Sequence, residues 1–190
     1  MKALLIDFED SFTHNVAHYL YAYGISYRSV HWRDYEENHS WDLVILGPGP
    51  GSALDYREFL EKIAPSLEGH SHESSPFYFG ICLGHQLLGL WADLELYRSR
   101  PLHGQRVESS IPRWNCFPKK AWGKRVFVQR YNSWSLRGRP SDSEMSLSED
   151  AMFLRGRHFL SYQFHPESIG TSCPRLFFES VFKLAYNKKS

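Results

Sequence analysis

A cysteine near two glycines stands in the stretch Gly80-Ile81-Cys82-Leu83-Gly84. An apolar run precedes this stretch and an amphipathic run starts at His85, so the sequence predicts a sharp turn from a strand into a helix. Glycines beside a reactive residue permit strained backbone angles and leave room for a ligand. The partial positive charge of a helix N-terminus favours a thiolate. Cys82 is therefore a candidate nucleophile, although a cysteine between apolar residues is also a common small core residue.

A candidate base and its orienting carboxylate lie in His165-Pro166-Glu167. His165 ends an apolar run that is typical of a strand, and Glu167 follows two residues later. In an extended chain, residues i and i+2 point to the same side, so we expect both side chains to reach the same thiol. A nucleophile, a base and an orienting acid are the three parts of a covalent acyl-transfer site. A histidine before proline is also typical of an ordinary turn, and the prediction depends on both stretches together.

The cysteine stretch continues with His85-Gln86, and Gln163-Phe164 precedes the histidine stretch. With these neighbours, both stretches resemble the signatures of class I (triad-type) glutamine amidotransferases. Further stretches resemble the small (glutaminase) subunit of anthranilate synthase and of aminodeoxychorismate synthase. They are Leu5-Ile6-Asp7, Asp10-Ser11-Phe12-Thr13-His14-Asn15, Pro48-Gly49-Pro50-Gly51, Leu102-His103-Gly104 and Arg130-Tyr131-Asn132-Ser133. The resemblance runs from about residue 3 to the C-terminus.

The resemblance implies a glutaminase reaction on L-glutamine. Cys82 would attack the side-chain amide, His165 would carry the proton, and Glu167 would orient the imidazole. Ammonia would leave, and the glutamyl thioester would be hydrolysed to glutamate. The resemblance also implies a separate large chorismate-binding synthase subunit as the partner that uses the ammonia. It leaves open whether the product is anthranilate or aminodeoxychorismate.

Backbone donors and substrate contacts also follow from the resemblance. The oxyanion would be bound by the backbone N–H groups of Leu83 and Gly49. The substrate contacts would be Gly49, Pro50, Gly51, Gln86, Ser133 and Trp134. Without the resemblance, the loop from Gly47 to Gly51 is typical of a Pro-Gly turn, Gln86 of a helix surface and Trp134 of a core. The sequence departs from the family pattern at Gln105, Asn132 and Trp134, which affects substrate packing and the identity of the partner.

Two other functions remain open at this point. One is a stand-alone γ-glutamyl hydrolase or amidase of the same fold, and Asp10-Ser11-Phe12-Thr13 favours a synthase subunit over it. The other is a non-catalytic regulatory subunit, and the presence of all three residues Cys82, His165 and Glu167 favours a catalyst over it.

Composition sets wider limits. A chain of 190 residues with 42% hydrophobic and 16% aromatic residues is expected to form a single domain over 1–190. A net charge of +1 argues against a nucleic-acid partner. Three scattered cysteines without C-x-x-C, and two histidines, His14 and His18, without a third ligand, predict no metal and no other cofactor. The sequence has no signal peptide and no apolar run near the ~18 residues of a membrane span, which predicts a cytoplasmic protein with no membrane contact.

The hydrophobic patterns predict an α/β fold, a mostly parallel sheet with helices on both faces. The resemblance implies the flavodoxin-like architecture of class I glutamine amidotransferases. Strands are predicted over 3–7, 25–32, 43–46 and 77–81, and then, in a region of short strands, over 94–97, 105–111, 126–130, 151–154 and 159–164. Helices are predicted over 11–23, 56–67, 85–91 and 175–185.

Local signals predict how these helices begin and end. Asp10 or Ser11 is expected to cap the first helix and Ser172 the last, with Pro174 in its first turn. Pro65 is expected to break the second helix. The polar segment 69–75 is expected to be a surface loop. Cys82 and the loop from Gly47 to Gly51 each follow a predicted strand, so both are expected at the carboxyl edge of the sheet, where α/β proteins place their sites.

Overall fold

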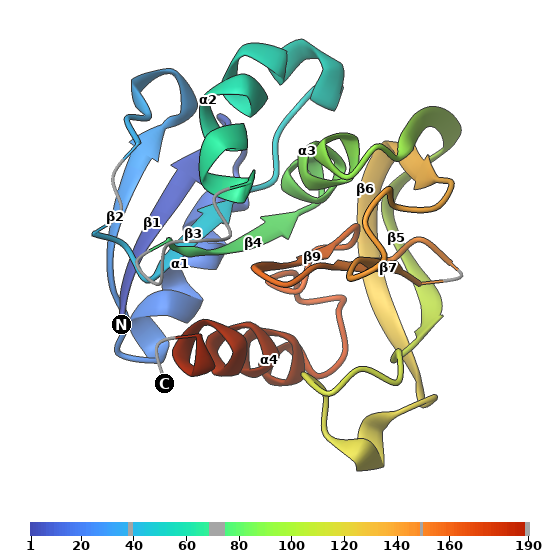
Figure 1. The fold of residues 1–190 in the computed structure, drawn as a ribbon. Helices are drawn as coiled ribbons and strands as arrows, with labels where there is room; N and C mark the ends of the chain where they lie inside the picture. The colour runs from blue at the N-terminus through green and yellow to red at the C-terminus, as the bar shows by residue number, and fades with distance from the viewer. Residues whose placement is uncertain (38–39, 69–74, 149, 189–190) are drawn as a thin grey trace.

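A seven-stranded sheet lies at the centre of the fold, which is a computed structural model that describes residues 1–37, 40–68, 75–148 and 150–188 (Figure 1). The strand order is β2-β1-β3-β4-β9-β8-β7. Their bounds are β1 (Lys2–Asp7), β2 (Ser26–His31), β3 (Leu43–Leu46), β4 (Phe77–Ile81), β7 (Ser146–Leu147), β8 (Phe153–Arg155) and β9 (Phe159–Tyr162). The first five in the order are parallel, and β8 and β7 continue the sheet antiparallel. The parallel strands have the flavodoxin-like order, which confirms the predicted fold class.

Helices cover both faces of this sheet (Figure 1). They are α1 (Thr13–Ala22), α2 (Arg57–Glu68), α3 (Leu83–Trp91) and α4 (Pro174–Asn187). Alternate residues of β3 point into two different clusters: Ile45 joins the core that contains α1 and α4, and Val44 joins the core that contains α2 and α3. A strand buried on both faces must be apolar at every position, which explains the unbroken run of β3.

A long two-stranded ribbon lies beside the main sheet. It consists of β5 (Glu95–Ser110) and β6 (Arg125–Arg137), paired antiparallel. The sequence predicted two short strands, over 94–97 and 105–111, in place of β5. The structure corrects this: the strand continues past Pro101 and Gly104 through register irregularities between Arg98 and Leu102 and between His103 and Gln105. Bulges accept a residue without an N–H or with positive φ, and Gly104 has φ +67°.

The prediction that Pro65 breaks the second helix was wrong. Helix α2 continues to Glu68 with Pro65 inside it. The proline removes one hydrogen bond to the carbonyl of Glu61, four residues earlier. Both residues are exposed, so water can satisfy that carbonyl. Burial of Ile63 and Leu67 on the opposite side holds the helix together.

The predicted side-chain caps are also absent. Helix α1 has Phe12 at its N-cap and no side-chain cap, and Asp10 instead accepts a hydrogen bond from the Phe12 N–H at 2.8 Å. Helix α4 has Cys173 at its N-cap, in the left-handed conformation. The Ser172 N–H donates to the Phe127 carbonyl of β6, which fixes the chain before α4. Pro174 occupies the first turn, as predicted.

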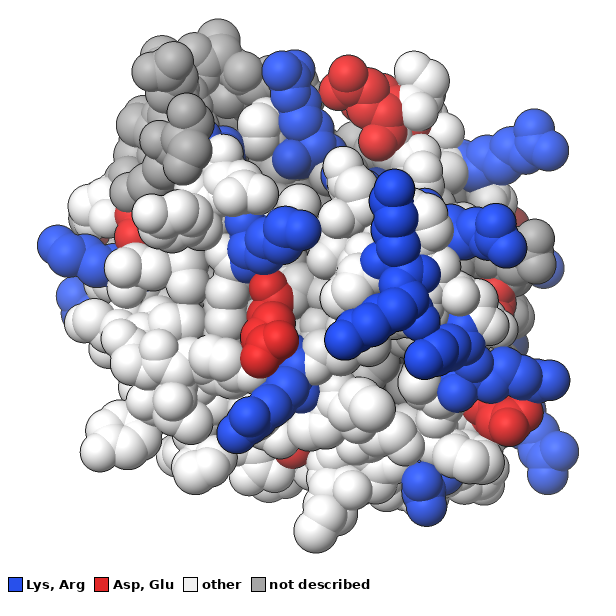
Figure 2. All heavy atoms as spheres, turned by 90° about the horizontal axis from the view of Figure 1, so that it is seen from below, with Lys and Arg blue, Asp and Glu red and all other residues white. Residues whose placement is uncertain are grey.

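Charge is spread unevenly over the surface. Figure 2 shows the face seen from below in Figure 1, where Lys and Arg side chains outnumber Asp and Glu. The segment 111–124, at the bottom of Figure 1, contains several basic residues and no acidic one. The predicted loop 69–75 falls almost entirely on 69–74, outside the described residues. No helix in the described part of the chain is long and apolar enough to span a membrane.

Candidate active site

The carboxyl ends of the parallel strands bring the predicted site residues together. Asp7 ends β1, Gly47 follows β3, Cys82 follows β4, and His165 lies three residues beyond β9. Neighbouring parallel strands end at the same edge of a sheet, so residues from four distant parts of the sequence meet there. The sequence predicted this placement for Cys82 and for the loop from Gly47 to Gly51, and the structure confirms it.

Cys82 forms a sharp elbow between β4 and α3. Its backbone angles are φ 51° and ψ −97°, and its N–H donates to the Tyr162 carbonyl of β9 at 2.8 Å. A Cβ at Gly80 would lie 2.6 Å from the Gly84 carbonyl oxygen, and one at Gly84 would lie 2.1 Å from the Leu46 carbonyl oxygen. Both contacts are with backbone, which cannot move away, so the elbow requires both glycines. The helix begins at Leu83 and not at the predicted His85.

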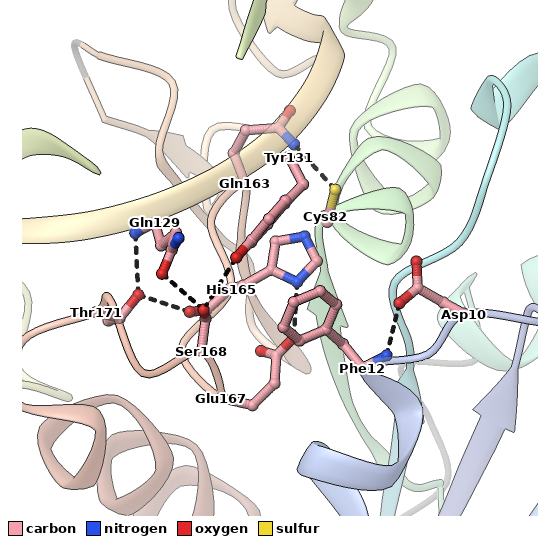
Figure 3. A network of polar contacts seen from close by, with 10 residues as sticks. All are labelled: Asp10, Phe12, Cys82, Gln129, Tyr131, Gln163, His165, Glu167, Ser168 and Thr171. Atoms are coloured by element: carbon pink, nitrogen blue, oxygen red, sulfur yellow. Dashed lines mark hydrogen bonds and ion pairs between the residues drawn. The ribbon is translucent and has the colours of Figure 1, made fainter. Parts of the chain in front are cut away.

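His165 and Glu167 form a buried ion pair. Nδ1 of His165 lies 2.7 Å from Oε1 of Glu167, and their side chains are 2% and 0% exposed. The expectation of an extended chain here was wrong, because β9 ends at Tyr162 and Glu167 lies in a turn. That turn is closed by the Ser168 N–H, which donates to the His165 carbonyl at 3.2 Å. The carboxylate therefore contacts the imidazole from behind, and the imidazole separates it from Cys82 (Figure 3).

Strand β6 holds this turn in place. The His165 N–H donates to the Gln129 carbonyl at 2.9 Å, and the Thr171 hydroxyl donates to the His165 carbonyl at 2.6 Å. The Ser168 hydroxyl donates to the Gln129 side chain at 2.8 Å. Both the backbone and the ring of the histidine are therefore fixed by neighbouring groups (Figure 3).

Electrostatics favour a charged His165. Burial lowers its pKa, but the charges of Glu167 and Cys82 outweigh burial and hold the pKa well above its usual value. Nε2 is buried without a hydrogen-bond partner among the described residues, and in Figure 3 it points toward Cys82. The rings of Phe12 and Tyr131 pack against the imidazole, with centroids 5.1 and 5.0 Å away, and shield it from water. This arrangement can exchange a proton with a group at Cys82.

The other two cysteines lie in different environments. Cys116 belongs to the hydrophobic core, and burial raises its pKa to about 11, so it stays a neutral thiol near pH 7. Cys173 is exposed at the start of α4. Among the described residues, Cys82 is the one cysteine that lines the cavity of about 600 Å³ at the edge of the sheet.

This cavity collects the residues that the resemblance assigned to the substrate and the oxyanion. It is lined by Gly49, Pro50, Gly51, Leu83, Gln86, Ser133 and Trp134. His165 and Glu167 lie behind its wall and not in its lining. The lining also includes residues that the sequence did not indicate as substrate contacts, namely Ser52, Asp55, Arg98, His103, Tyr131 and Asn132. The roles of all these residues remain predictions.

The glycine loop packs closely against the start of α3. A Cβ at Gly49 would lie 2.3 Å from a methyl carbon of Leu83 and 2.6 Å from Cβ of Phe8. Gly51 has φ +75°, and the Pro50 carbonyl accepts a hydrogen bond from the Tyr56 hydroxyl at 3.1 Å. Gly49 therefore packs against the side chain of Leu83, and the role of their two N–H groups as donors to one oxyanion remains a prediction.

Two buried glutamines connect the cysteine to the wall of the cavity. The Gln86 amide donates to the Trp134 carbonyl at 3.2 Å and to the Gln163 side chain at 3.3 Å. The Gln163 amide in turn donates to Sγ of Cys82 at 3.9 Å. Gln86 is buried and not on a helix surface. No local signal in the sequence marked Gln163 as part of the site, although it stands two residues before His165.

Asn132, where the sequence departs from the family pattern, stabilises the same wall. It accepts a hydrogen bond from Nε of Arg130 at 2.9 Å and donates to the Trp134 carbonyl at 2.6 Å. Arg130 also donates to the Ser135 hydroxyl at 3.1 Å. Burial lowers the pKa of Arg130, and the charge of Cys82 acts against this effect. A buried cation without a carboxylate partner in the described chain thus lies on the cysteine side of β6.

A strand-to-helix cysteine elbow with a buried histidine at the carboxyl edge of a flavodoxin-like sheet defines an α/β protein with a nucleophile-type site. The family model for "Glutamine amidotransferase class-I" matches residues 4–184, and the chain belongs to this family.

Relatives carry two related names. Anthranilate synthase component 2 of Helicobacter pylori is 30% identical over 90% of this chain and 91% of its own length. An anthranilate synthase described as phenazine specific, from Pseudomonas fluorescens, is 30% identical over 90% of this chain. An aminodeoxychorismate synthase of Streptomyces griseus is 32% identical over the same share. The chain spans only 27% and 24% of the length of these last two relatives.

Solved structures share the fold at lower identity. A protein of Thermoplasma acidophilum, described as part of a GMP synthase, superposes with a TM-score of 0.80 at 16% identity and covers 98% of this chain and 94% of its own. A glutamine amidotransferase of Thermotoga maritima gives a TM-score of 0.64 at 18% identity, over 100% and 93% of the two chains.

Proposed function

We propose that this chain is the glutaminase component of a chorismate-using synthase and that it works through a thioester on Cys82. The observation that carries the proposal is the buried pair of His165 and Glu167 behind a strained elbow cysteine. Such a pair costs desolvation energy and is poor support for stability alone. Its placement next to a cysteine that lines a cavity supports a chemical role.

The proposed reaction begins with transfer of the Cys82 thiol proton to His165, and the raised pKa of His165 supports the imidazolium that forms. The sulfur attacks the carbonyl carbon of the glutamine side-chain amide, and the Leu83 and Gly49 N–H groups stabilise the oxyanion. His165 gives its proton to the leaving nitrogen, the C–N bond breaks, and ammonia departs. His165 then takes a proton from water, which attacks the thioester and releases glutamate. Glu167 orients the ring and stabilises its charge throughout.

The proposed partner is a large chorismate-binding subunit that receives the ammonia. The names of the relatives support this, since they are synthases of anthranilate and of aminodeoxychorismate. We place the contact surface at residues 10–15 and the loop from Gly47 to Gly51. Phe12 packs on the ring of His165, so a partner that moves this segment can change the site directly. Coupling of this kind is typically about 1–3 kcal/mol, or roughly 5- to 150-fold in rate.

Glutamate release from glutamine, with and without the synthase subunit, tests the proposal. Cys82→Ala should abolish glutamine-dependent product formation but leave the reaction with free ammonia intact, because the partner carries the second step. Cys116→Ala and Cys173→Ala are matched controls that should retain glutaminase activity. Glutaminase turnover at the wild-type rate in Cys82→Ala would refute the assignment of Cys82 as the nucleophile. Full activity of the isolated chain, unchanged by partner and chorismate, would instead favour a stand-alone amidase.

A further inference from the structure

Two opposite charges face the cavity of Cys82 from different elements. Arg98 belongs to β5, and Asp55 belongs to the short helix η2 (Ala53–Tyr56) that follows the glycine loop. Among the described residues that line this cavity, Arg98 is the only lysine or arginine and Asp55 the only aspartate or glutamate. An amino-acid substrate carries both charges at one end, so the cavity offers a counter-charge for each.

The guanidinium of Arg98 has no partner within the described part of the chain: no hydrogen bond or ion pair to it occurs there. Other arginines of the same ribbon are paired, Arg125 with Glu108 at 2.8 Å and Arg137 with Glu95. In the register of the ribbon, Arg98 lies opposite Trp134. Gln86 and Asn132 hold the carbonyl of Trp134, so the wall beside Arg98 is fixed while its charged group stays open.

The carboxylate of Asp55 is oriented before any ligand arrives. Its Oδ2 accepts a hydrogen bond from the Ser52 N–H at 2.8 Å, as part of a capping box at the start of η2. The same oxygen lies 2.8 Å from the position that a Cβ of Gly51 would occupy, so the glycine admits the carboxylate to the loop. Oδ1 has no hydrogen-bond partner among the described residues and is left to meet a donor in the cavity.

We propose that Arg98 binds the α-carboxylate and Asp55 the α-ammonium group of the substrate, which makes both residues determinants of specificity for amino acids over simple amides. This inference rests on the proposed function, because the side-chain amide of the same substrate must reach Cys82. A planar guanidinium matches a carboxylate with two parallel hydrogen bonds. The two contacts hold one end of the molecule and direct the other toward the elbow, which is the use of remote binding groups in catalysis.

Alkylation of Cys82 tests the inference without turnover or a partner. The chloroketone analogue of L-glutamine carries the amino-acid end, whereas iodoacetamide carries no charge. Arg98→Ala and Asp55→Asn should each slow alkylation by the chloroketone about tenfold and leave the rate with iodoacetamide unchanged, since a hydrogen bond to a charged group is lost. Asp55→Asn keeps a side-chain oxygen that can accept the hydrogen bond from the Ser52 N–H, so the capping box is retained. Arg100→Ala and Glu58→Gln, on neighbouring exposed positions outside the cavity lining, are matched controls that should change neither rate.

A third reagent separates the possible causes. The same chloroketone without its α-carboxylate should react more slowly with the wild type and be insensitive to Arg98→Ala. If Arg98→Ala slows all three reagents equally, or none of them, the assignment of Arg98 is wrong. Failure of the proposed function itself would give a different result. The wild type would then react equally fast with the chloroketone and with the reagent that lacks the α-carboxylate. In that case the amino-acid end is not recognised at all, and the inference fails with it.

Discussion

Glu167→Gln tests the electrostatic design of the site, because it removes the charge behind His165 and keeps the shape of the side chain. Opposite charges 2.7 Å apart attract by about 6 kcal/mol at an effective dielectric constant of about 20. Burial opposes the charged ring, and Glu167 and Cys82 outweigh it in the wild type. Without Glu167 we expect the pKa of His165 to fall and kcat/KM for glutamine to drop by about 10⁴-fold, comparable to the loss of an orienting acid in other triads.

The direction of the pH dependence follows from the raised pKa. The charged ring stabilises the folded wild type below the pKa of an unfolded histidine, and this contribution is lost as the pH rises through the pKa of the folded state. In Glu167→Gln the ring should lose its proton at lower pH, which an NMR titration of the His165 ring carbon would follow. Glu179→Gln, an exposed acid on α4, is the matched control. A titration of His165 that is unchanged or moves to higher pH in Glu167→Gln would refute the reasoning.

Three further predictions test other parts of the structure. Gly84→Ala should destabilise the fold by about 1–3 kcal/mol in urea unfolding and inactivate the site, because its Cβ would lie 2.1 Å from the backbone oxygen of Leu46; a stable, active variant would contradict the account of the elbow. Burial lowers the pKa of His85 to about 3, so an unfolded chain binds a proton there below about pH 6.5 and the folded chain does not. The protonation of His85 in the unfolded chain should therefore lower the free energy of unfolding by about 2 kcal/mol from pH 7 to pH 5. In His85→Gln, the free energy of unfolding should fall by about 2 kcal/mol less over the same pH range. Asn132→Ala should raise KM for glutamine and cost about 1–3 kcal/mol of stability, because it leaves the buried Arg130 short of a partner; unchanged steady-state kinetics would argue against its role in the wall.

The elbow and the buried strand β3 were predictable because the residues that mark them are adjacent in the sequence. Gly80 is required by contacts with Gly84 within the same turn, whereas Gly84 is required by its close approach to Leu46 of β3, and the apolar run of β3 follows from burial on both faces. The long ribbon was not predictable, since Pro101 and Gly104 look like strand ends and only pairing with β6 carries the strand past them. Tertiary burial likewise overrode the helix-breaking tendency of Pro65.

Contacts from distant elements explain what the sequence did not reveal at the site. Arg98 and Asp55 share one cavity although the helices α2 and α3 and the strand β4 separate them in the chain. Neither has a local pattern that marks it, in contrast to the glycines around Cys82. His165 and Glu167 were predicted from their spacing, but the turn that joins their side chains depends on hydrogen bonds to β6.

The central claim is that glutamine acylates Cys82, and trapping the intermediate tests it most directly. Wild-type protein mixed with L-glutamine and quenched in acid should gain the mass of one γ-glutamyl group, and peptide analysis should place it on Cys82. Ammonia release without any adduct on Cys82, or an adduct on Cys116 or Cys173 in its place, would contradict the account.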